Sequence, residues 1–185
     1  MAPIGIFFAS ENGGTGELAR LIQQQYLPKG AAVVHNLDDT DAAQMDGFGA
    51  LLFATSTTGC GDLPAALEAF VPELDAVDFK RKVVALVGLG DQVNYPDEFA
   101  DALGVLYQEL RGRGAAVVGA WPTAGYDYQR SRADLGDGAF CGLVLDQENQ
   151  ADLTPQRLTR WVESVRAQLL AGGADGAGAG AGQTV

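Results

Sequence analysis

Six short apolar runs, separated by segments of helical periodicity, constrain the fold of this chain more than any other feature. They cover residues 4–9, 31–36, 50–55, 83–89, 116–121 and 140–145. Because the runs are almost continuously hydrophobic, they indicate strands that are covered on both faces. Apolar residues recur at helical spacing over 18–26, 67–74, 99–110 and 158–169. This alternation predicts a doubly wound α/β sandwich of three layers with a parallel sheet.

Three segments depart from the alternation. Residues 122–139 have no helical pattern, which predicts a loop that interrupts the last strand and makes 116–121 and 140–145 its two parts. The connection after residue 36 has room for only a short helix. From Ala171 the chain is rich in glycine and alanine and cannot bury enough apolar surface to become ordered. We therefore expect one domain over 1–170 and a disordered tail over 171–185, with a linker role as the alternative for the tail.

The acidic balance of the chain limits its partners. With 24 acidic and 12 basic side chains, the formal net charge is −12, which disfavours nucleic acid and anionic membranes. It favours basic protein partners, although solubility alone is an alternative reason for the charge. The sequence has no apolar run of 18 residues and no signal-peptide pattern, so we expect a cytoplasmic protein. Cys60 and Cys141 form no CxxC pair, which argues against structural zinc and dithiol chemistry.

Three polar loops follow the ends of strands that a parallel sheet would bring to one edge. They are SENGGT at 10–15, TSTTGCGDLP at 55–64 and GDQVNYP at 90–96. The first offers backbone amides and small polar side chains at a helix start but no lysine or arginine, which favours a phosphomonoester over a triphosphate. No GK[ST] follows it, which excludes a Walker loop. An ordinary capped glycine-rich turn is the alternative.

The other two loops suit a flat ligand. Glycine on both sides of Cys60 makes positive φ accessible, so the peptide between Gly59 and Cys60 is able to reorient. Tyr95, close to Asp91 and ahead of a helix expected near Asp97, offers a ring for stacking. The alternative for the second loop is a long turn without a ligand, and the alternative for Tyr95 is a ring that only covers apolar neighbours. Together at one edge, the three loops predict a site for a planar heterocycle that carries one phosphate.

The residues of these loops resemble the long-chain flavodoxins over nearly the whole chain before the tail. The similarity rests on SENGGTGELA at 10–19, TSTTGCGDLP at 55–64, VALVGLGDQVNYPDEFADALG at 84–104, GLVLDQENQADLT at 142–154 and the interrupting loop after Trp121. This resemblance implies a five-stranded parallel sheet of order 2-1-3-4-5. It also implies non-covalently bound FMN at the point where the strand order reverses.

The resemblance also implies which residues contact FMN. The phosphate would be held by Ser10, Asn12 and Thr15 and by the amides of Glu11, Gly13 and Gly14. The ring would lie between Tyr95 and the second loop, whose implied contacts are Thr55, Ser56, Thr57, Thr58, Gly59, Cys60 and Gly61. The pyrimidine edge and ribityl chain would lie near Gly90, Asp91 and Asp146. Two positions depart from the family, which usually has threonine in place of Asn12 and often a large side chain in place of Thr58.

The function implied by the resemblance is that of a low-potential one-electron carrier, not an enzyme, in which FMN shuttles between semiquinone and hydroquinone. Residues 55–101 hold nine acidic and three basic side chains, and this charge would lower the second reduction potential. The expected partners of this monomer are basic surfaces of redox proteins, with a flavodoxin reductase as donor and an oxidoreductase or nitrogenase-type acceptor. Nitrogen fixation is one of several roles left open. An FMN-dependent NAD(P)H:quinone reductase is the main alternative, and a cofactor-free interaction domain is another.

The remaining residues with reactive side chains are expected to be structural. His35 is the only histidine and has no identifiable catalytic partner. Cys141 is expected in the core. Cys60 is expected to be a small filler in the second loop, with an exposed thiol open to oxidation as the alternative. Arg157, Arg160 and Arg166 are expected on the solvated face of the last helix. We expect no metal site and no catalytic set.

Overall fold

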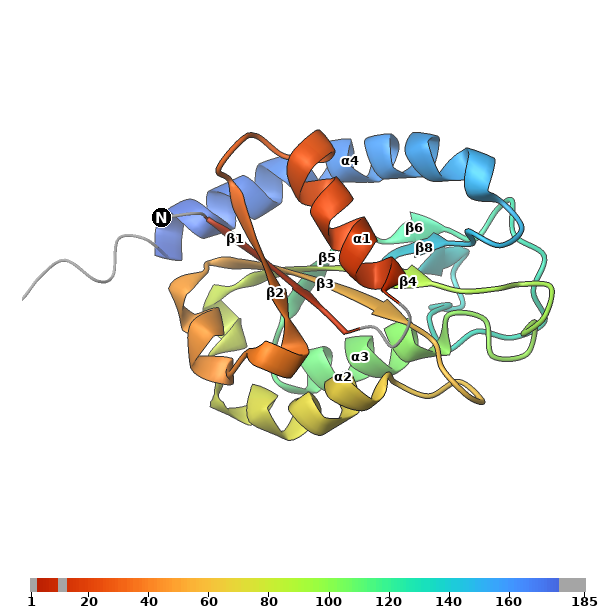
Figure 1. Ribbon diagram of the computed structural model, residues 1–185, viewed down its shortest axis with the longest axis horizontal. Helices are drawn as coiled ribbons and strands as arrows, with labels where there is room; N and C mark the ends of the chain where they lie inside the picture. Colours follow the sequence, from red (N-terminus) through yellow and green to blue (C-terminus); the bar gives the residue numbers. More distant parts are fainter. Residues whose placement is uncertain (1–2, 10–12, 177–185) are drawn as a thin grey trace, which may run out of the picture.

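The computed structural model describes residues 3–9 and 13–176 and forms three layers (Figure 1). The central parallel sheet has the order β2-β1-β3-β4-β5, and β8 also pairs with β4. This confirms the predicted α/β sandwich and its strand order. The sheet consists of β1 (Ile4–Phe8), β2 (Ala32–Asn36), β3 (Ala50–Ser56), β4 (Val83–Leu89), β5 (Ala116–Val118) and β8 (Leu143–Leu145).

Two helices cover each face of the sheet. They are α1 (Gly14–Leu21) and α4 (Thr154–Gly176) on one face, and α2 (Ala65–Phe70) and α3 (Asp101–Gly112) on the other. Short turns of helix complete the connections: η1 (Ile22–Tyr26), η2 (Leu37–Asp39), η3 (Ala42–Gly47), η4 (Val71–Ala76), η5 (Phe79–Arg81) and η6 (Ala151–Leu153). The connection after residue 36 is therefore limited to η2 and η3, as its length predicts.

The strands are apolar on both faces because both faces are buried. In β1, Ile4 and Ile6 pack in the cluster under α1 and α4, whereas Phe7 packs in the cluster under α2 and α3. Side chains alternate across a strand, so a strand with a core on each side cannot show the polar alternation of a half-exposed one. The continuous apolar runs thus follow directly from the three-layer arrangement.

The last strand is split, as the sequence predicts. β5 pairs with the first part of β4 (Val83↔Ala116), and β8 pairs with its last part (Val87↔Leu143), both in parallel. The intervening loop contains a small antiparallel pair, β6 (Trp121–Pro122) and β7 (Ala139–Phe140), which the sequence pattern does not predict.

The interrupting loop is anchored on α3. Gly104 makes this possible, because a Cβ there would lie 2.2 Å from the carbonyl oxygen of Arg132. The buried carboxylate of Asp101 accepts a 2.7 Å hydrogen bond from the Arg132 amide. Beneath the loop, the ring of Phe99 lies 5.3 Å from that of Tyr128 and 6.1 Å from that of Phe140. The loop therefore closes a second aromatic core rather than extending freely into solvent.

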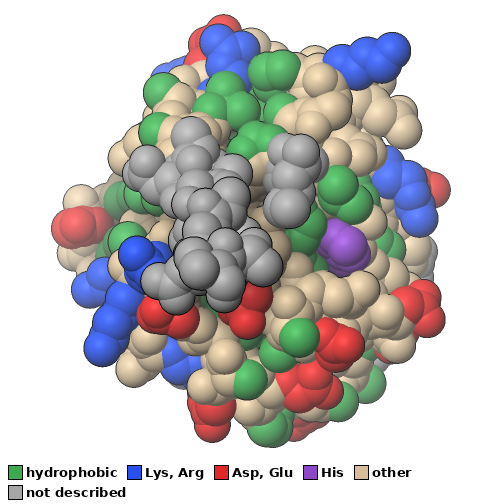
Figure 2. Space-filling view, turned by 90° about the vertical axis from the view of Figure 1, so that its left-hand side faces the viewer, with side chains coloured by type: hydrophobic (Ala, Val, Ile, Leu, Met, Phe, Trp, Pro, Cys, Tyr) green, Lys and Arg blue, Asp and Glu red, His purple; other side chains and the backbone are tan. Residues whose placement is uncertain are grey.

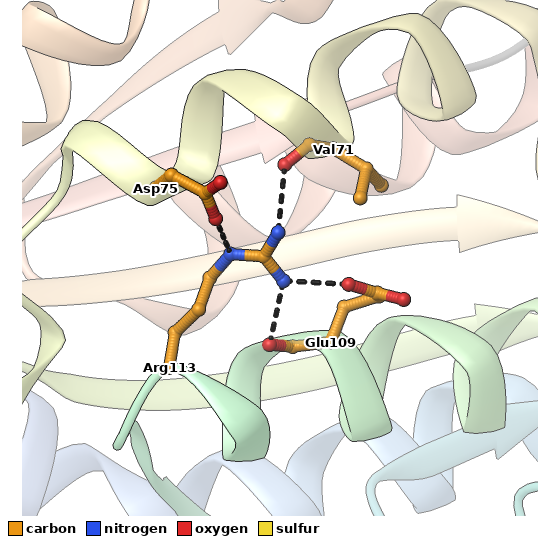
Figure 3. Close-up of polar contacts among 4 residues, drawn as sticks. All are labelled: Val71, Asp75, Glu109 and Arg113. Atoms are coloured by element: carbon orange, nitrogen blue, oxygen red, sulfur yellow. Dashed lines mark hydrogen bonds and ion pairs between the residues drawn. The ribbon is translucent and has the colours of Figure 1, made fainter.

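Arg113, which follows α3, joins α3 with η4 on the face of the sheet that α2 and α3 cover (Figure 3). Its Nε lies 2.8 Å from a carboxylate oxygen of Asp75 in η4, and its Nη1 lies 2.6 Å from Oε2 of Glu109. Nη2 also donates to the carbonyl oxygen of Val71 at 3.3 Å. Because Asp75 is well exposed, water screens this network, and each pair contributes about 1 kcal/mol or less.

Several boundaries differ from those expected from sequence. α3 begins at Asp101, not near Asp97, because the chain first turns through Ala100, whose φ is 54°. α4 continues to Gly176, six residues beyond the domain boundary expected at 170. For the rest of the tail, residues 177–185, disorder stays a prediction, because these residues lie outside the described part of the chain.

One expectation for α4 is wrong. Arg157 does not lie on its solvated face, because the residue is 8 % exposed and its guanidinium stands over the ring of Tyr126, 4.1 Å from the centroid. Arg160 and Arg166 are exposed, as predicted.

His35 and Cys141 have surroundings that suit structural roles. The imidazole of His35 stacks on Phe7 at 5.0 Å and meets the edge of Phe48 at 5.5 Å, and desolvation by burial lowers its pKa. Burial raises the pKa of the Cys141 thiol to about 12, so this cysteine remains a neutral thiol near pH 7.

Candidate functional site at the carboxyl edge of the sheet

The carboxyl ends of the strands, at the right of Figure 1, carry a cavity of about 430 Å³. Seven of the sequence-predicted site residues line it: Ser56, Thr57, Thr58, Gly59, Gly90, Asp91 and Tyr95. They come from the loops after β3 and β4, which parallel pairing places side by side. The volume lies within the roughly 300–1,000 Å³ typical of sites for small organic ligands. The structure thus brings two of the three predicted loops to one cavity.

The loop after β3 is closed at its base by paired backbone groups. The Thr58 amide donates to the carbonyl of Asp62 at 3.0 Å, and the Asp62 amide donates to the carbonyl of Thr58 at 2.8 Å. The Thr58 hydroxyl lies 3.2 Å from the Asp62 carbonyl and 3.1 Å from that of Leu63, so it is placed to donate to either. Thr58 therefore closes the loop through its side chain as well as its backbone.

Between Thr58 and Asp62, the tip of the loop consists of Gly59, Cys60 and Gly61. Both glycines adopt positive φ, 52° at Gly59 and 92° at Gly61. A Cβ on Gly61 would also lie 2.8 Å from a carboxylate oxygen of Asp101. Cys60 is exposed and, like Gly61, does not line the cavity, so it is not the buried filler expected from sequence. Both glycines therefore adopt the positive φ that the sequence predicts to be accessible to them.

The loop after β4 is organised by Asp91. Its Oδ1 accepts hydrogen bonds from the amides of Val93 and Asn94 at 3.1 and 2.9 Å, and from Nδ2 of Asn149 at 2.9 Å. Desolvation opposes ionisation of the Asp91 carboxyl, but these hydrogen bonds outweigh it and lower its pKa. The Tyr95 amide donates to the Asp91 carbonyl at 3.0 Å, which sets the half-exposed tyrosine at the cavity. The Asp91 backbone thus helps to place Tyr95 at the cavity.

Asp146 lies behind this wall rather than in the cavity lining, so a direct contact with a ligand there is not supported. The residue is 0 % exposed, and its Oδ2 accepts from the Gln92 amide at 3.1 Å. Its Oδ1 accepts from the Asn149 amide at 3.0 Å. Asp146 therefore connects the loop after β4 with the loop after β8, and acts by positioning other residues.

The first polar loop is only partly described. Ser10, Glu11 and Asn12 lie outside the described residues. Gly13 caps α1 with a φ of 80° and no side-chain hydrogen bond, and Gly14 is the first residue of α1. Thr15 is buried, and its hydroxyl donates to the Ala9 carbonyl at 2.8 Å. The amides of the first turn of α1 remain free of intrahelical partners, as at any helix N-terminus.

Thr55 is another predicted residue that is absent from the cavity lining, and five residues of the lining were not predicted. Thr55 is 1 % exposed and lies beneath the loop rather than in the lining. The prediction omitted Leu89, Glu98, Ala100, Gln147 and Glu148. Gln147 and Glu148 belong to the LDQENQ stretch, whose position after a buried strand was a usable signal. Ala100 and Glu98 reach the cavity only because α3 starts late, which the sequence pattern does not reveal.

The lining fits a flat, uncharged ring system better than an extended anion. Gly90 leaves no room for a side chain, because a Cβ there would lie 2.7 Å from the Phe99 ring and 3.1 Å from the Ala100 amide nitrogen. Three carboxylates, those of Asp91, Glu98 and Glu148, line the cavity, and no lysine or arginine does among the described residues. A phosphate would find better donors at the start of α1.

Comparison with known proteins agrees with this geometry. The flavodoxin family model matches residues 6–161. The chain belongs to the flavodoxin family. It is 40 % identical over 169 residues to flavodoxin 1 of Salmonella typhimurium, covering 91 % of this chain and 96 % of the relative. It is 39 % identical over 166 residues to a flavodoxin of Picosynechococcus, covering 90 % and 97 %.

A solved flavodoxin structure shows the same arrangement. The flavodoxin of Fusobacterium nucleatum, bound to flavin mononucleotide, superposes with a TM-score of 0.84 at 33 % identity, over 91 % of this chain and 99 % of that one. Family membership together with the split last strand makes this chain a long-chain member of the flavodoxins. In the part that the structure describes, no helix has both the length and the apolar character required to cross a membrane.

Proposed function

We propose that the protein is a one-electron carrier that binds FMN non-covalently at the carboxyl edge of the sheet. The observation that carries this proposal is the cavity between the loops after β3 and β4, lined by Tyr95 and by Thr57–Gly59, in a chain of the flavodoxin family. When bound, FMN supplies the electron-transfer chemistry. The FMN-bound Fusobacterium flavodoxin supports the choice of cofactor.

The chain's own residues divide the binding task among three loops. Residues 10–15 would hold the phosphate with amides and short polar side chains, without a cation. Tyr95 would stack on the ring, with Ser56–Gly59 on its other side, because both line the same cavity. Gly90 and Asp91 would lie along the ring edge and the sugar chain. Asp146 would act through the Gln92 amide that it holds.

The lining carboxylates would oppose the addition of negative charge to a bound ligand. Asp91, Glu98 and Glu148 lie at the cavity without a basic residue in the described lining. A one-electron potential shifts by about 59 mV for roughly 1.4 kcal/mol of unfavourable interaction. Several screened charges, together with desolvation, would therefore lower the second reduction potential more than the first.

The partners we propose are redox proteins with basic surfaces, one that supplies electrons and one that accepts them, met by a cytoplasmic monomer. The net charge of −12 supports electrostatic attraction to such surfaces. Acidic side chains also gather along the lower part of the opposite edge of the sheet (Figure 2), so the negative charge is not confined to the cofactor site. We therefore expect the charge to accelerate encounter with a basic partner and the cavity edge to determine productive orientation.

Cofactor loading and electrochemistry test the proposal. The purified full-length chain should take up one equivalent of FMN, measured by quenching of flavin fluorescence, and should show two separate one-electron potentials by spectroelectrochemistry. Electron transfer to a basic partner should slow as salt is added. Failure to take up FMN would overturn the proposal. Steady oxidation of NAD(P)H with a quinone acceptor would instead favour the reductase alternative.

A further inference from the structure

A separate hollow of about 260 Å³ lies between β6 and the first turns of α4. Its lining includes Trp121, Pro122, Gln156, Arg157 and Arg160. No acidic side chain occurs among the described residues that line it. This is unexpected in a chain in which 24 acidic residues outnumber 12 basic ones. The hollow is therefore a local concentration of positive charge on an acidic protein.

Arg157 is the unusual member of this group. It is 8 % exposed, its guanidinium lies 4.1 Å from the ring centroid of Tyr126, and its Nη1 is buried with no hydrogen-bond partner in the described structure. No carboxylate among the described residues pairs with it. A buried cation without a counter-ion is costly, and contact with an aromatic ring offsets only part of that cost.

The neighbours of Arg157 hold it in place. The Tyr126 hydroxyl donates to the Val144 carbonyl at 2.5 Å and accepts a 3.0 Å hydrogen bond from Nε1 of Trp121. Burial raises the pKa of Tyr126 to about 12, so it remains a neutral ring beneath the guanidinium. Arg160, one turn later, stands over the Trp121 ring at 5.7 Å. Two arginines thus stand over two linked aromatic rings beside one hollow.

The helix adds a smaller contribution of the same sign. Gln156 and Arg157 lie near the N-terminal end of α4, a helix of 23 residues, and this is the positive end of the helix dipole. The backbone adds no free donor at its first two positions, because the Thr154 amide is paired with the Ala151 carbonyl and Pro155 has no N–H. A helix N-terminus alone would not define a site. Here it coincides with a buried guanidinium that lacks a counter-ion.

We propose that this hollow binds a small oxyanion, a phosphate or a carboxylate, between Arg157 and Arg160. A guanidinium presents paired N–H groups that match two oxygens of such a ligand, and the anion would supply the missing counter-charge. The volume is below the roughly 300–1,000 Å³ of sites for larger organic ligands, which favours a small anion. This site shares no lining residue with the cofactor cavity and does not depend on electron transfer; only its test makes use of FMN binding.

The test uses the FMN-loaded protein, so that the start of α1 is not available to added phosphate. Sodium phosphate and sodium acetate are titrated separately, with sodium chloride keeping the ionic strength constant, and binding is followed by the NMR signal of the Trp121 indole N–H. We expect saturable shifts. Arg157→Gln and Arg160→Gln should each weaken binding by about tenfold or more. Arg166→Gln, an exposed change farther along the same helix, is the matched control and should bind like the wild type.

Each outcome bears on the proposal. Saturation by phosphate alone would identify a phosphate site, and saturation by acetate would identify a carboxylate site. Arg160 is exposed, so Arg160→Gln should keep the fold even if loss of Arg157 does not. If neither anion saturates the signal, or if Arg160→Gln and Arg166→Gln respond alike, the proposal is wrong.

Discussion

The loops after β3 and β4 line the same cavity, but they hold their shape by different means. The loop after β4 is organised by two carboxylates, Asp91 and Asp146, which accept hydrogen bonds from amides of this loop and of the loop after β8. The loop after β3 has a backbone bridge between Thr58 and Asp62 and a tip of Gly59, Cys60 and Gly61 without side-chain anchors. One wall of the site is therefore fixed by hydrogen bonds to two carboxylates, of which Asp146 is buried, and the other has a fixed base and an adaptable tip.

This difference suits a carrier whose ligand changes its hydrogen-bonding needs. A wall that orients the ligand should not move, because reorganisation would slow electron transfer. A tip that reorients one peptide can stabilise one form of the ligand by about 1 kcal/mol, the net contribution of a single hydrogen bond. The contrast predicts that changes to the fixed wall affect mainly stability, whereas changes to the tip affect mainly the two reduction potentials.

Loss of Asp146 should produce the largest effect. Asp146→Ala removes a buried acceptor and leaves the amides of Gln92 and Asn149 without partners, so the free energy of unfolding should fall by about 3 kcal/mol. Chemical denaturation measures this. Asp152→Ala, an exposed change in η6, is the control and should be nearly neutral. A loss as small as that of the control would show that the wall is not fixed by this carboxylate.

A side chain at Gly59 should change the two reduction potentials as well as the free energy of folding. Gly59→Val places a β-branched residue at φ 52°, which costs about 1–2 kcal/mol of folding free energy. We also expect the two one-electron potentials of the FMN-loaded protein to move closer together, measured by spectroelectrochemistry. Gly47→Val, where a Cβ has nothing within 4 Å, is the comparison variant. Unchanged potentials in Gly59→Val would contradict a reorienting tip.

Thr58 tests the base of the same loop. Thr58→Val keeps the shape but removes the hydroxyl that donates to the carbonyls of Asp62 and Leu63, so the free energy of unfolding should fall by about 1 kcal/mol. Amide hydrogen exchange at Asp62 should become faster. Thr159→Val removes a comparable hydroxyl on the exposed side of α4 and should leave this amide unaffected. Equal exchange rates at Asp62 in both variants would show that the Thr58 hydroxyl does not help to close the loop.

Acid should act on the fixed wall through Asp91, with the smallest effect. Its pKa is lowered from 3.8, so its carboxylate stabilises the native state above the ordinary value, and that contribution is lost as the pH falls through the lowered value. Asp91→Asn should be slightly less stable than the wild type near neutral pH, and the two should converge in acid. Tryptophan fluorescence in denaturant, at low protein concentration, measures the difference. A constant difference across the whole pH range would contradict this role.

The sheet could be predicted from the sequence because the strands are buried on both faces. Strands buried in this way are almost entirely apolar, as residues 4–9 and 83–89 are. The sequence also predicted that the loops after β3 and β4 meet at one edge, since glycine and short polar residues mark the strand ends. It could not place Arg157 or Asp146, because their burial depends on Tyr126 and Gln92, which are far away in the sequence. The late start of α3 also escaped prediction, since it arises from one backbone turn at Ala100.

Because the last strand is split, the long loop leaves the sheet at the end of β5 and returns to it at the nearby start of β8. Val118 pairs with Ala85 and Leu143 pairs with Val87, so the chain leaves the sheet and returns to it on either side of Leu86. A short peptide could therefore join the two ends without altering any other strand. Such a shortened protein would expose Phe99 and the face of α3 near Gly104, so it would need polar replacements there to remain soluble.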